Sequence, residues 1–204
     1  MCGPVSRSCR ASEVNLRRAV SDSLVERGFH RSGRTVVQRL GDEWSFWVDT
    51  GPLGKSADIT PFVGIRNDRV EELFACLLGV PHDKYVGTVG ANVGYLIDGQ
   101  VITWVEPTPA DEVVRAIERA LERLRPYLSL DRLPQAWELK GASDPGKLYR
   151  LVVIALLRGD RESAMQALEN ARKVFCKVEN AVCDQFRDFE ARALQYLSGQ
   201  LPAK

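Results

Sequence analysis

The feature that most constrains this fold is a change in the spacing of apolar residues at Gly28. Before it, over residues 12–27, apolar side chains recur at intervals of four, which predicts an amphipathic helix with Ser12 as its cap and Gly28 at its end. After it, the segments 34–40 and 44–49 show a spacing of two on either side of a Gly-Asp-Glu turn, as the strands of a β-hairpin do. The chain therefore begins with a helix followed by an antiparallel sheet.

A third strand and a second helix follow. The segment 57–65 is rich in β-branched residues, and we expect it at a sheet edge or bulge because Pro61 cannot donate a ladder hydrogen bond. Asn67 or Asp68 then caps a helix that Gly79 ends.

Residues 84–107 return to the composition of strands. Asp98 and Gly99 separate two apolar runs and predict a second hairpin turn. Pro109 then opens a helix whose apolar stripe ends at Leu128. The charged residues on its other face can pair with one another, so we interpret that face as solvated.

A connection with two prolines and two glycines divides the chain. We expect a flexible N-terminus at 1–11, an α+β sheet domain at 12–128, the connection at 129–146, and a helical appendage at 147–204. The predicted fold class is α+β, with a mainly antiparallel sheet of four to six strands and flanking helices, followed by an α-helical hairpin plus a third helix. One such helical unit cannot bury both of its faces, so we expect it to dock on the sheet domain or on a partner.

The sequence carries no targeting signal, so we expect a cytoplasmic protein without membrane contact. The N-terminus lacks the apolar region of a secretory signal, and no apolar run is long enough to span a bilayer. The five cysteines are odd in number and irregularly spaced, so we expect no disulfide framework. We interpret Cys176 and Cys183 as buried apolar side chains. The two histidines join no cluster with zinc spacing, so we expect no metal and no cofactor.

Positive charge gathers in residues 1–40, which hold eight arginines against three acidic residues, although the whole chain carries a net charge of only +1. Such a segment can bind nucleic acid, and that alternative stays open. We prefer to explain the charge by arginines on the solvent side of a helix and a strand, because no aromatic platform for bases accompanies them. We therefore favour a protein partner over a nucleic acid.

Two glycine-containing loops raise the question of a bound ligand. Gly54, Lys55 and Ser56 resemble the end of a phosphate-binding loop, but Asp49 stands where that loop needs its first glycine. The glycines of residues 87–94 have the wrong spacing for a dinucleotide fingerprint. The alternative function is a small-ligand or nucleotide-binding domain, catalytic or not, that uses loop 51–56 or 87–94 and the residues Gly87, Gly90, Gly94 and Lys55.

No set of residues predicts catalysis. Cys76 lies near His82 and Asp83 in the sequence, but we expect Cys76 on the inner side of its helix as a buried thiol. Paired carboxylates occur in the first turns of helices, where the helix dipole explains them.

The aromatic residues are more informative. Trp44 and Trp47 have opposite parity on one strand, so they cannot both face one core unless the sheet is covered on both sides. Large aromatics near arginines are typical of protein-binding hot spots. Two explanations stay open: the sheet is covered on both sides, or the exposed aromatics form a partner-binding surface. For the second, the expected partner-binding residues are Trp47, Arg34, Arg39, Trp104 and Tyr95.

The order of features over residues 12–128 resembles the uncharacterised, mainly bacterial domain-of-unknown-function 4304 family. The matching segments are LVERGFHRSGRTVVQRL, WSFWVDTG, PFVGI and the Trp104 strand followed by TPADEVVRAIERALERLRPYL. The resemblance implies an α+β domain with an antiparallel sheet and no established activity or site residues. Some similar proteins are thought of as immunity proteins in bacterial conflict loci. We therefore expect a non-catalytic protein-binding module, as an immunity or regulatory protein for a cognate bacterial partner.

Overall fold

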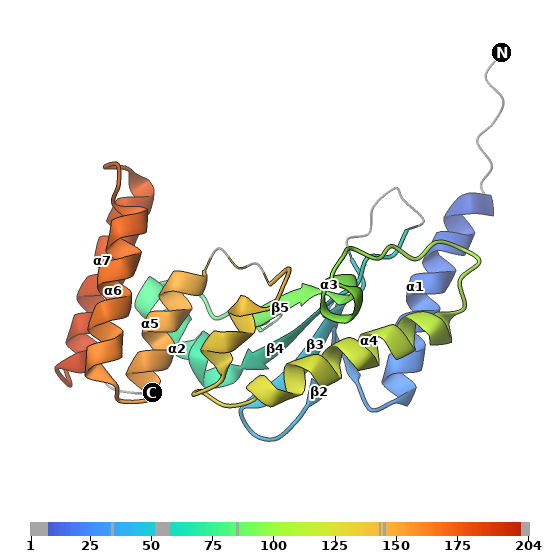
Figure 1. The fold of residues 1–204 in the computed structure, drawn as a ribbon, viewed down its shortest axis with the longest axis horizontal. Coiled ribbons are helices and arrows are strands. Elements are labelled where there is room, and N and C mark those ends of the chain that lie inside the picture. Colours follow the sequence, from blue (N-terminus) through green and yellow to red (C-terminus); the bar gives the residue numbers. More distant parts are fainter. Residues whose placement is uncertain are drawn as a thin grey trace, which may run out of the picture.

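The computed structural model describes residues 8–33, 35–51, 58–84, 86–142, 144 and 146–200. A five-stranded antiparallel sheet in the order β1-β2-β3-β4-β5 carries helices along one face, and three further helices stand at one end of the molecule (Figure 1). The predicted α+β class, with its antiparallel sheet and C-terminal helices, is confirmed.

The strands are β1 (His30–Ser32), β2 (Thr35–Arg39), β3 (Trp44–Asp49), β4 (Phe62–Asn67) and β5 (Val89–Asn92). The α-helices are α1 (Ser8–Glu26), α2 (Asp68–Leu78), α3 (Val93–Asp98), α4 (Ala110–Leu124), α5 (Lys147–Leu157), α6 (Arg161–Phe175) and α7 (Ala181–Leu197). Two short 3-10 helices, η1 (Arg125–Tyr127) and η2 (Leu133–Glu138), lie in the segment that leads from α4 to α5.

Helices α1 and α4 cover the same face of the sheet. Val36, Val48 and Val63 lie side by side in register on that face, and all three are buried. Arg125, directly after α4, lies over the ring of Phe46 at 5.5 Å. Because Phe46 shares the parity of Val48, α4 lies over this face. Arg31, which is paired in register with Val36, forms an ion pair with an acidic residue of α1.

Local capping signals account for α2. The side chain of Asn67 accepts a hydrogen bond from the Val70 amide at 3.0 Å, and Gly79 adopts the left-handed conformation with φ of 73°. The Gly79 amide donates to the carbonyl of Ala75 at 2.9 Å. Both ends of this helix are therefore placed as the sequence predicts.

The helical appendage docks on α2, which contacts both α5 and α7. Arg150 of α5 makes two hydrogen bonds of 2.8 Å to the carboxylate of Glu71 in α2, and both residues are about 5% exposed or less. The same guanidinium lies 4.4 Å above the ring of Phe74 and forms an ion pair with Asp144 at 2.9 Å. The appendage is thus joined to the sheet domain by a buried charged contact.

An aromatic cluster continues this contact between the helices. Tyr149 stacks on Phe175 with ring centroids 4.7 Å apart and meets Phe189 edge-on at 4.8 Å. Phe74 of α2 and Phe186 of α7 complete the cluster. Helices α2, α5, α6 and α7 therefore share one apolar core.

Two predictions for the sheet domain are wrong. Helix α1 begins at Ser8, so Ser12 lies inside the helix and is not its cap, and residues 8–11 are helical. Pro61 lies just outside β4, which is an interior strand paired in continuous register on both sides, so the prediction of a sheet edge or bulge fails. Residues 129–146 lead from η1 to α5, and within them η2 buries Trp137, which is only 5% exposed.

The hairpin predicted at Asp98 and Gly99 is replaced by a helix. Asn92 accepts a hydrogen bond from the Gly94 amide at 2.8 Å and begins α3, and Gly99 ends it with φ of 72°. The next segment makes a single bridge to the sheet region, between Trp104 and Ile59. A glycine with positive φ is compatible with a hairpin turn and with a helix end. Because Asn92 caps the start of a helix, Gly99 marks the end of that helix and not a hairpin turn.

The cysteine predictions are also wrong. Cys176 and Cys183 form a disulfide across the turn between α6 and α7, with Cα atoms 4.7 Å apart. The chain turns between these helices, so the two cysteines face each other rather than lying along one helix. Cys76 is a free, exposed cysteine and not a buried thiol.

Candidate protein-binding surface

The second face of the sheet, opposite α1 and α4, is built by two rows of residues in register. One row is His30, Val37, Trp47, Gly64 and Gly90, and the other is Arg39, Ser45 and Arg66. Together with Phe62, these residues define what we call the Trp47 face. Trp44 has the opposite parity and packs against the core. The two tryptophans of β3 therefore point to different faces of the sheet.

Trp47 lies against three glycines from two parts of the chain, Gly64 in β4 and Gly87 and Gly90 just before and within β5. A Cβ atom at Gly64 or Gly87 would lie 2.4 Å or 1.4 Å from the indole Nε1 of Trp47. A Cβ atom at Gly90 would lie 3.1 Å from Cζ2 of the same ring. The indole ring thus occupies the space that a side chain at Gly87 would fill, and at Gly64 and Gly90 the ring and the backbone carbonyls of Val89 and Val63 together exclude one.

Close packing within the chain explains the glycines that the sequence analysis considered as ligand-binding residues. Gly87 and Gly90 are in contact with Trp47, and a Cβ at Gly94 would lie 2.4 Å from the backbone at both Gln100 and Ile102. All three glycines are used by close packing within the chain. Lys55 lies outside the described residues.

The charged end of the Trp47 face is organised around Asp68. Its carboxylate accepts hydrogen bonds from Arg66 at 2.6 Å and from Arg39. Burial alone would raise the pKa of Asp68, but the hydrogen bonds and charges of Arg39 and Arg66 lower it below its ordinary value of 3.8. Asp68 is therefore ionised at neutral pH and holds both guanidinium groups in place.

Arg66 also fixes the segment that follows α2. It is only 4% exposed, donates to the carbonyl of Asp83 at 2.9 Å and to that of Val86, and lies 2.6 Å from Nε2 of His82. This segment is thereby held near the β4 side of the Trp47 face, where Gly87 meets Trp47. The contact of His82 is with Arg66, and no bond to Cys76 is formed.

The accessible part of the face combines apolar and cationic groups. Phe62 is 45% exposed and Val86 is 44% exposed, while the side chain of Arg39 is 54% exposed. Trp47 is partly buried in its glycine seat. The sequence analysis missed Phe62 and Val86, although the alternation of Phe62 with the buried Val63 would have indicated that Phe62 faces away from the core.

The structure brings together two of the five residues expected to bind a partner. Trp47 and Arg39 share the Trp47 face, and Arg34 lies outside the described residues. Trp104 is 7% exposed in the core, where its backbone exchanges hydrogen bonds of 2.8 and 2.9 Å with Ile59. Tyr95 lies in α3 against Gly141. Trp104 and Tyr95 therefore pack against other parts of the chain and do not belong to the Trp47 face.

Several arginines in the described part of the basic N-terminal segment form ion pairs with acidic residues. Arg18 and Arg31 both pair with Asp22, and Arg27 pairs with Glu118 of α4 at 2.8 Å. These contacts direct the arginines of α1 and β1 toward neighbouring helices. They favour a structural role for the positive charge of residues 1–40 over a phosphate-binding role.

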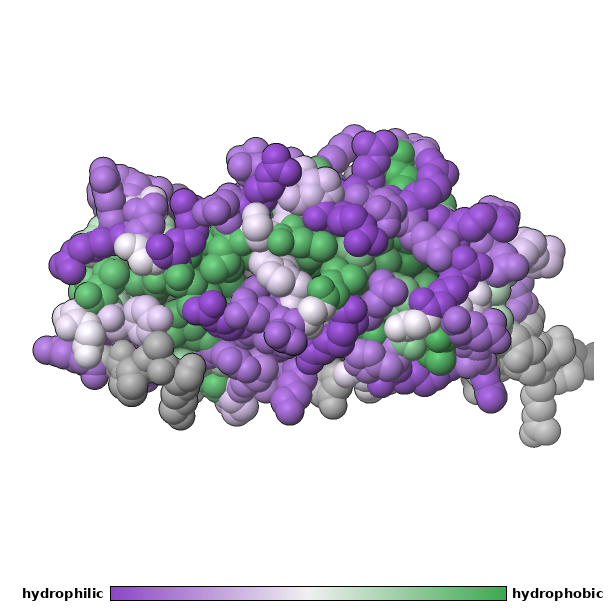
Figure 2. All heavy atoms as spheres, turned by 90° about the horizontal axis from the view of Figure 1, so that it is seen from below, coloured by the Kyte–Doolittle hydropathy of each residue, from purple (hydrophilic) through white to green (hydrophobic). Residues whose placement is uncertain are grey.

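A separate hollow lies in the helical end of the molecule. It has a volume of about 330 Å³ between η2, α5 and α6, with an apolar lining that includes Leu148, Leu151 and Ile154 and polar groups of Arg158 and Asn170. Seen from below, the molecule shows a band of apolar surface between hydrophilic margins (Figure 2). No residue of the Trp47 face lines this hollow, so the two surfaces are distinct.

Within the described ranges, no group of three or more His, Cys, Asp and Glu residues is arranged to hold a metal ion. Nor does the described part of the chain contain a helix long and apolar enough to cross a membrane.

Comparison with known proteins found no match among protein-family models, curated proteins or solved structures. What the fold defines is an α+β protein with a helical appendage, and the family resemblance of residues 12–128 stays an expectation.

Proposed function

We propose that this chain is a non-catalytic protein-binding module that acts in the cytoplasm as an immunity or regulatory protein for one cognate partner. The observation that carries the proposal is the Trp47 face. It places exposed Phe62 and Arg39 together with the partly buried Trp47 on the side of the sheet opposite α1 and α4.

The chemistry of this face suits a protein partner. Aromatic residues and arginine are the residue types that contribute most to protein–protein binding free energy. Trp47 is already fixed against its glycines and Arg39 against Asp68, so binding costs little conformational entropy at these two side chains. Phe62 and Val86 add apolar area that a partner would remove from water.

The test uses tagged full-length protein to capture partners from an extract of the source cells, followed by titration calorimetry with the purified partner. Phe62→Ser and Arg39→Ala are the informative variants, because Trp47 also fills its glycine seat and its loss would disturb the fold. Val101→Ser is the matched control, since Val101 is 50% exposed and lies outside the Trp47 face.

We expect one stoichiometric protein partner that binds the wild type and Val101→Ser alike. Phe62→Ser and Arg39→Ala should each weaken its binding at least about tenfold, the loss expected from a hot-spot residue. The proposal fails if the wild type captures no partner, or if both variants bind the partner as tightly as the control does.

A further inference from the structure

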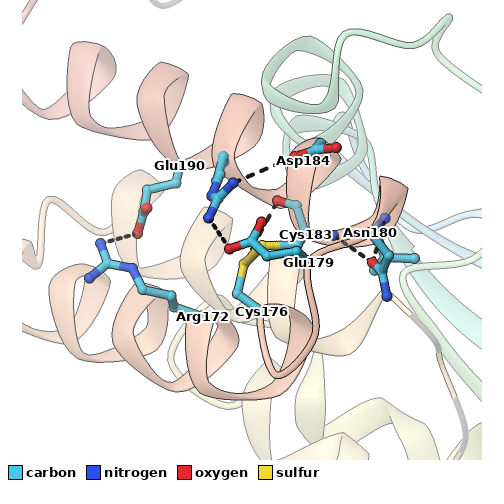
Figure 3. Close-up of a disulfide and its surroundings, with 9 residues drawn as sticks. Arg172, Cys176, Glu179, Asn180, Cys183, Asp184 and Glu190 are labelled. Atoms are coloured by element: carbon cyan, nitrogen blue, oxygen red, sulfur yellow. Dashed lines mark hydrogen bonds and ion pairs between the residues drawn. A yellow bond between two sulfur atoms is a disulfide. The ribbon is translucent and has the colours of Figure 1, made fainter.

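The disulfide between Cys176 and Cys183 lies at the turn that joins α6 to α7 (Figure 3). Cys176 directly follows the last residue of α6 and is partly exposed, whereas Cys183 lies in the first turn of α7 and is fully buried. An external thiolate can therefore approach the sulfur of Cys176 more easily than that of Cys183.

The first turn of α7 places the positive end of the helix dipole near the sulfur of Cys183, while the burial of this residue opposes a negative charge there. Asn180 caps the helix and accepts hydrogen bonds from the amides of Val182 at 3.0 Å and Cys183 at 3.1 Å. The positive end of the helix dipole lowers the free energy of a thiolate in this turn. Arg187 pairs with Glu179 and Asp184, which offsets the two carboxylates nearest to the cysteine (Figure 3).

We propose that Cys176 and Cys183 form a thiol–disulfide exchange site that reacts with thiol reductants. The thiolate of the reductant attacks Sγ of Cys176 and forms a mixed disulfide, while the Cys176–Cys183 bond breaks and its electron pair leaves on Sγ of Cys183. A second thiolate then attacks the reductant's sulfur in the mixed disulfide and releases Cys176. Two protons from solvent complete the two thiols, and the reductant leaves as its disulfide.

The expected compartment supports exchange over a purely structural bond. The sequence predicts a cytoplasmic chain, and disulfides in reducing compartments are mostly transient and redox-responsive. The leaving group is the thiolate that the helix dipole stabilises, which favours cleavage by attack on Cys176.

The redox state of the pair is coupled to the helical core through Phe175. This residue immediately precedes Cys176, stacks on Tyr149 and meets Phe186 with ring centroids 5.6 Å apart. Opening the disulfide frees the end of α6 to move, so the packing of Tyr149 changes with the redox state.

The first experiment uses the full chain with Cys2→Ser, Cys9→Ser and Cys76→Ser, so that only the pair can react. The protein is equilibrated in glutathione buffers of graded reduced-to-oxidised ratio, and in a parallel series with a small dithiol. Free thiols are then alkylated and counted by mass spectrometry. We expect two thiols per chain to appear and disappear reversibly with the ratio, together with a change in near-ultraviolet circular dichroism from the aromatic cluster.

A pair that stays oxidised in excess glutathione and excess dithiol would show a structural bond without exchange. A pair that stays reduced in oxidised glutathione would show that the bond does not form. Either result overturns the proposal. Reduction by the dithiol alone would assign the site to dithiol reductants, and reduction by both would include monothiols such as glutathione.

A second experiment tests which sulfur is attacked. In the same background, Cys183→Ser leaves Cys176 free and Cys176→Ser leaves Cys183 free. We expect oxidised glutathione to modify Cys176 at least about ten times faster than Cys183, because exposure governs thiol access. Equal rates, in variants whose circular dichroism matches the parent, would contradict attack at Cys176, and the thiol titration of the parent decides the proposal should a variant fail to fold.

Discussion

Trp47 and the three glycines beneath it come from three separate places in the sequence and meet only in the folded sheet. From the local sequence alone, the glycines of residues 87–94 suggest a ligand-binding loop. A local glycine pattern does not show whether a ligand or another part of the chain packs against it. In the structure Gly87 and Gly90 pack against an indole ring from β3, and Gly94 packs against the backbone at Gln100 and Ile102. The sequence indicated that Trp47 faces away from Trp44, but only the strand register identifies Gly64 and Gly90 as its neighbours.

Replacing Gly87 by alanine should destabilise the protein through a clash with this ring. The added Cβ would lie 1.4 Å from Nε1 of Trp47, so the ring or the backbone must move. Overpacking of this kind costs about 1–3 kcal/mol of unfolding free energy. Denaturant unfolding followed by tryptophan fluorescence measures the change. Gly159→Ala is the control, since no atom lies within 4 Å of its Cβ and only its φ of 69° is unfavourable.

A double-mutant cycle separates the clash from other effects of the new methyl group. In a Trp47→Ala background the space above Gly87 is empty, so Gly87→Ala should cost much less than it does in the wild type. Equal costs in the two backgrounds would mean that Trp47 is not the residue with which the methyl group collides.

At the level of single elements, α2 was the easiest helix to predict and α3 the hardest. The cap of α2 at Asn67 and its end at Gly79 are adjacent in sequence to the helix they bound, so local reading suffices. Helix α3 has only six residues, and its composition resembles that of a strand. The disulfide was missed although Asn180, a strong N-cap residue, signals the break between α6 and α7.

A contact between elements stabilises the C-terminal end of α2. Arg192 of α7 donates a hydrogen bond of 3.0 Å to the carbonyl of Leu77, and its guanidinium lies close to Gly79. The helix dipole places negative potential at this end. We expect Arg192→Ala to lower the unfolding free energy by about 1.5–3 kcal/mol, the range for a hydrogen bond to a charged group.

Chemical denaturation measures this effect, with Arg187→Ala as the control on the same helix. Arg187 forms only exposed ion pairs near the start of α7, so its loss should change stability far less. Similar losses for the two variants would show that Arg192 contributes through general surface charge and not through α2.

At the scale of the whole molecule, α2 belongs to both parts of the chain. It follows β4 directly and also contacts α5 and α7, so the predicted sheet domain and helical appendage share an element. Composition predicted the appendage and its need to dock. It could not identify α2 as the docking site, because Glu71 and Arg150 lie 79 positions apart and only the fold pairs them.

Arg150→Met should therefore destabilise the entire molecule. The substitution leaves the carboxylate of Glu71 buried without its partner, and breaking a buried ion pair in this way costs about 3–5 kcal/mol. We expect a single unfolding transition, shifted to lower denaturant, when far-ultraviolet circular dichroism and tryptophan fluorescence are followed together. Arg158→Met, which removes a more exposed pair with Asp131, should cost no more than about 1 kcal/mol.

Two separate transitions for the wild type would contradict the shared core, since the helices would then unfold apart from the sheet. A loss for Arg150→Met no greater than that for Arg158→Met would show that the buried pair does not couple the two parts.

The seat of Trp47 also bears on how this protein can diverge. A side chain larger than glycine at position 87 is compatible only with a small residue at position 47. Positions 64 and 90 are constrained by the backbone as well, because a Cβ atom there would lie 2.5 Å from the Val89 carbonyl oxygen or 2.8 Å from that of Val63. Lineages that lose the tryptophan are therefore released from glycine at position 87 but not at positions 64 and 90. One tryptophan and three glycines at these positions therefore form a signature by which remote relatives can be recognised after the rest of the sequence has drifted.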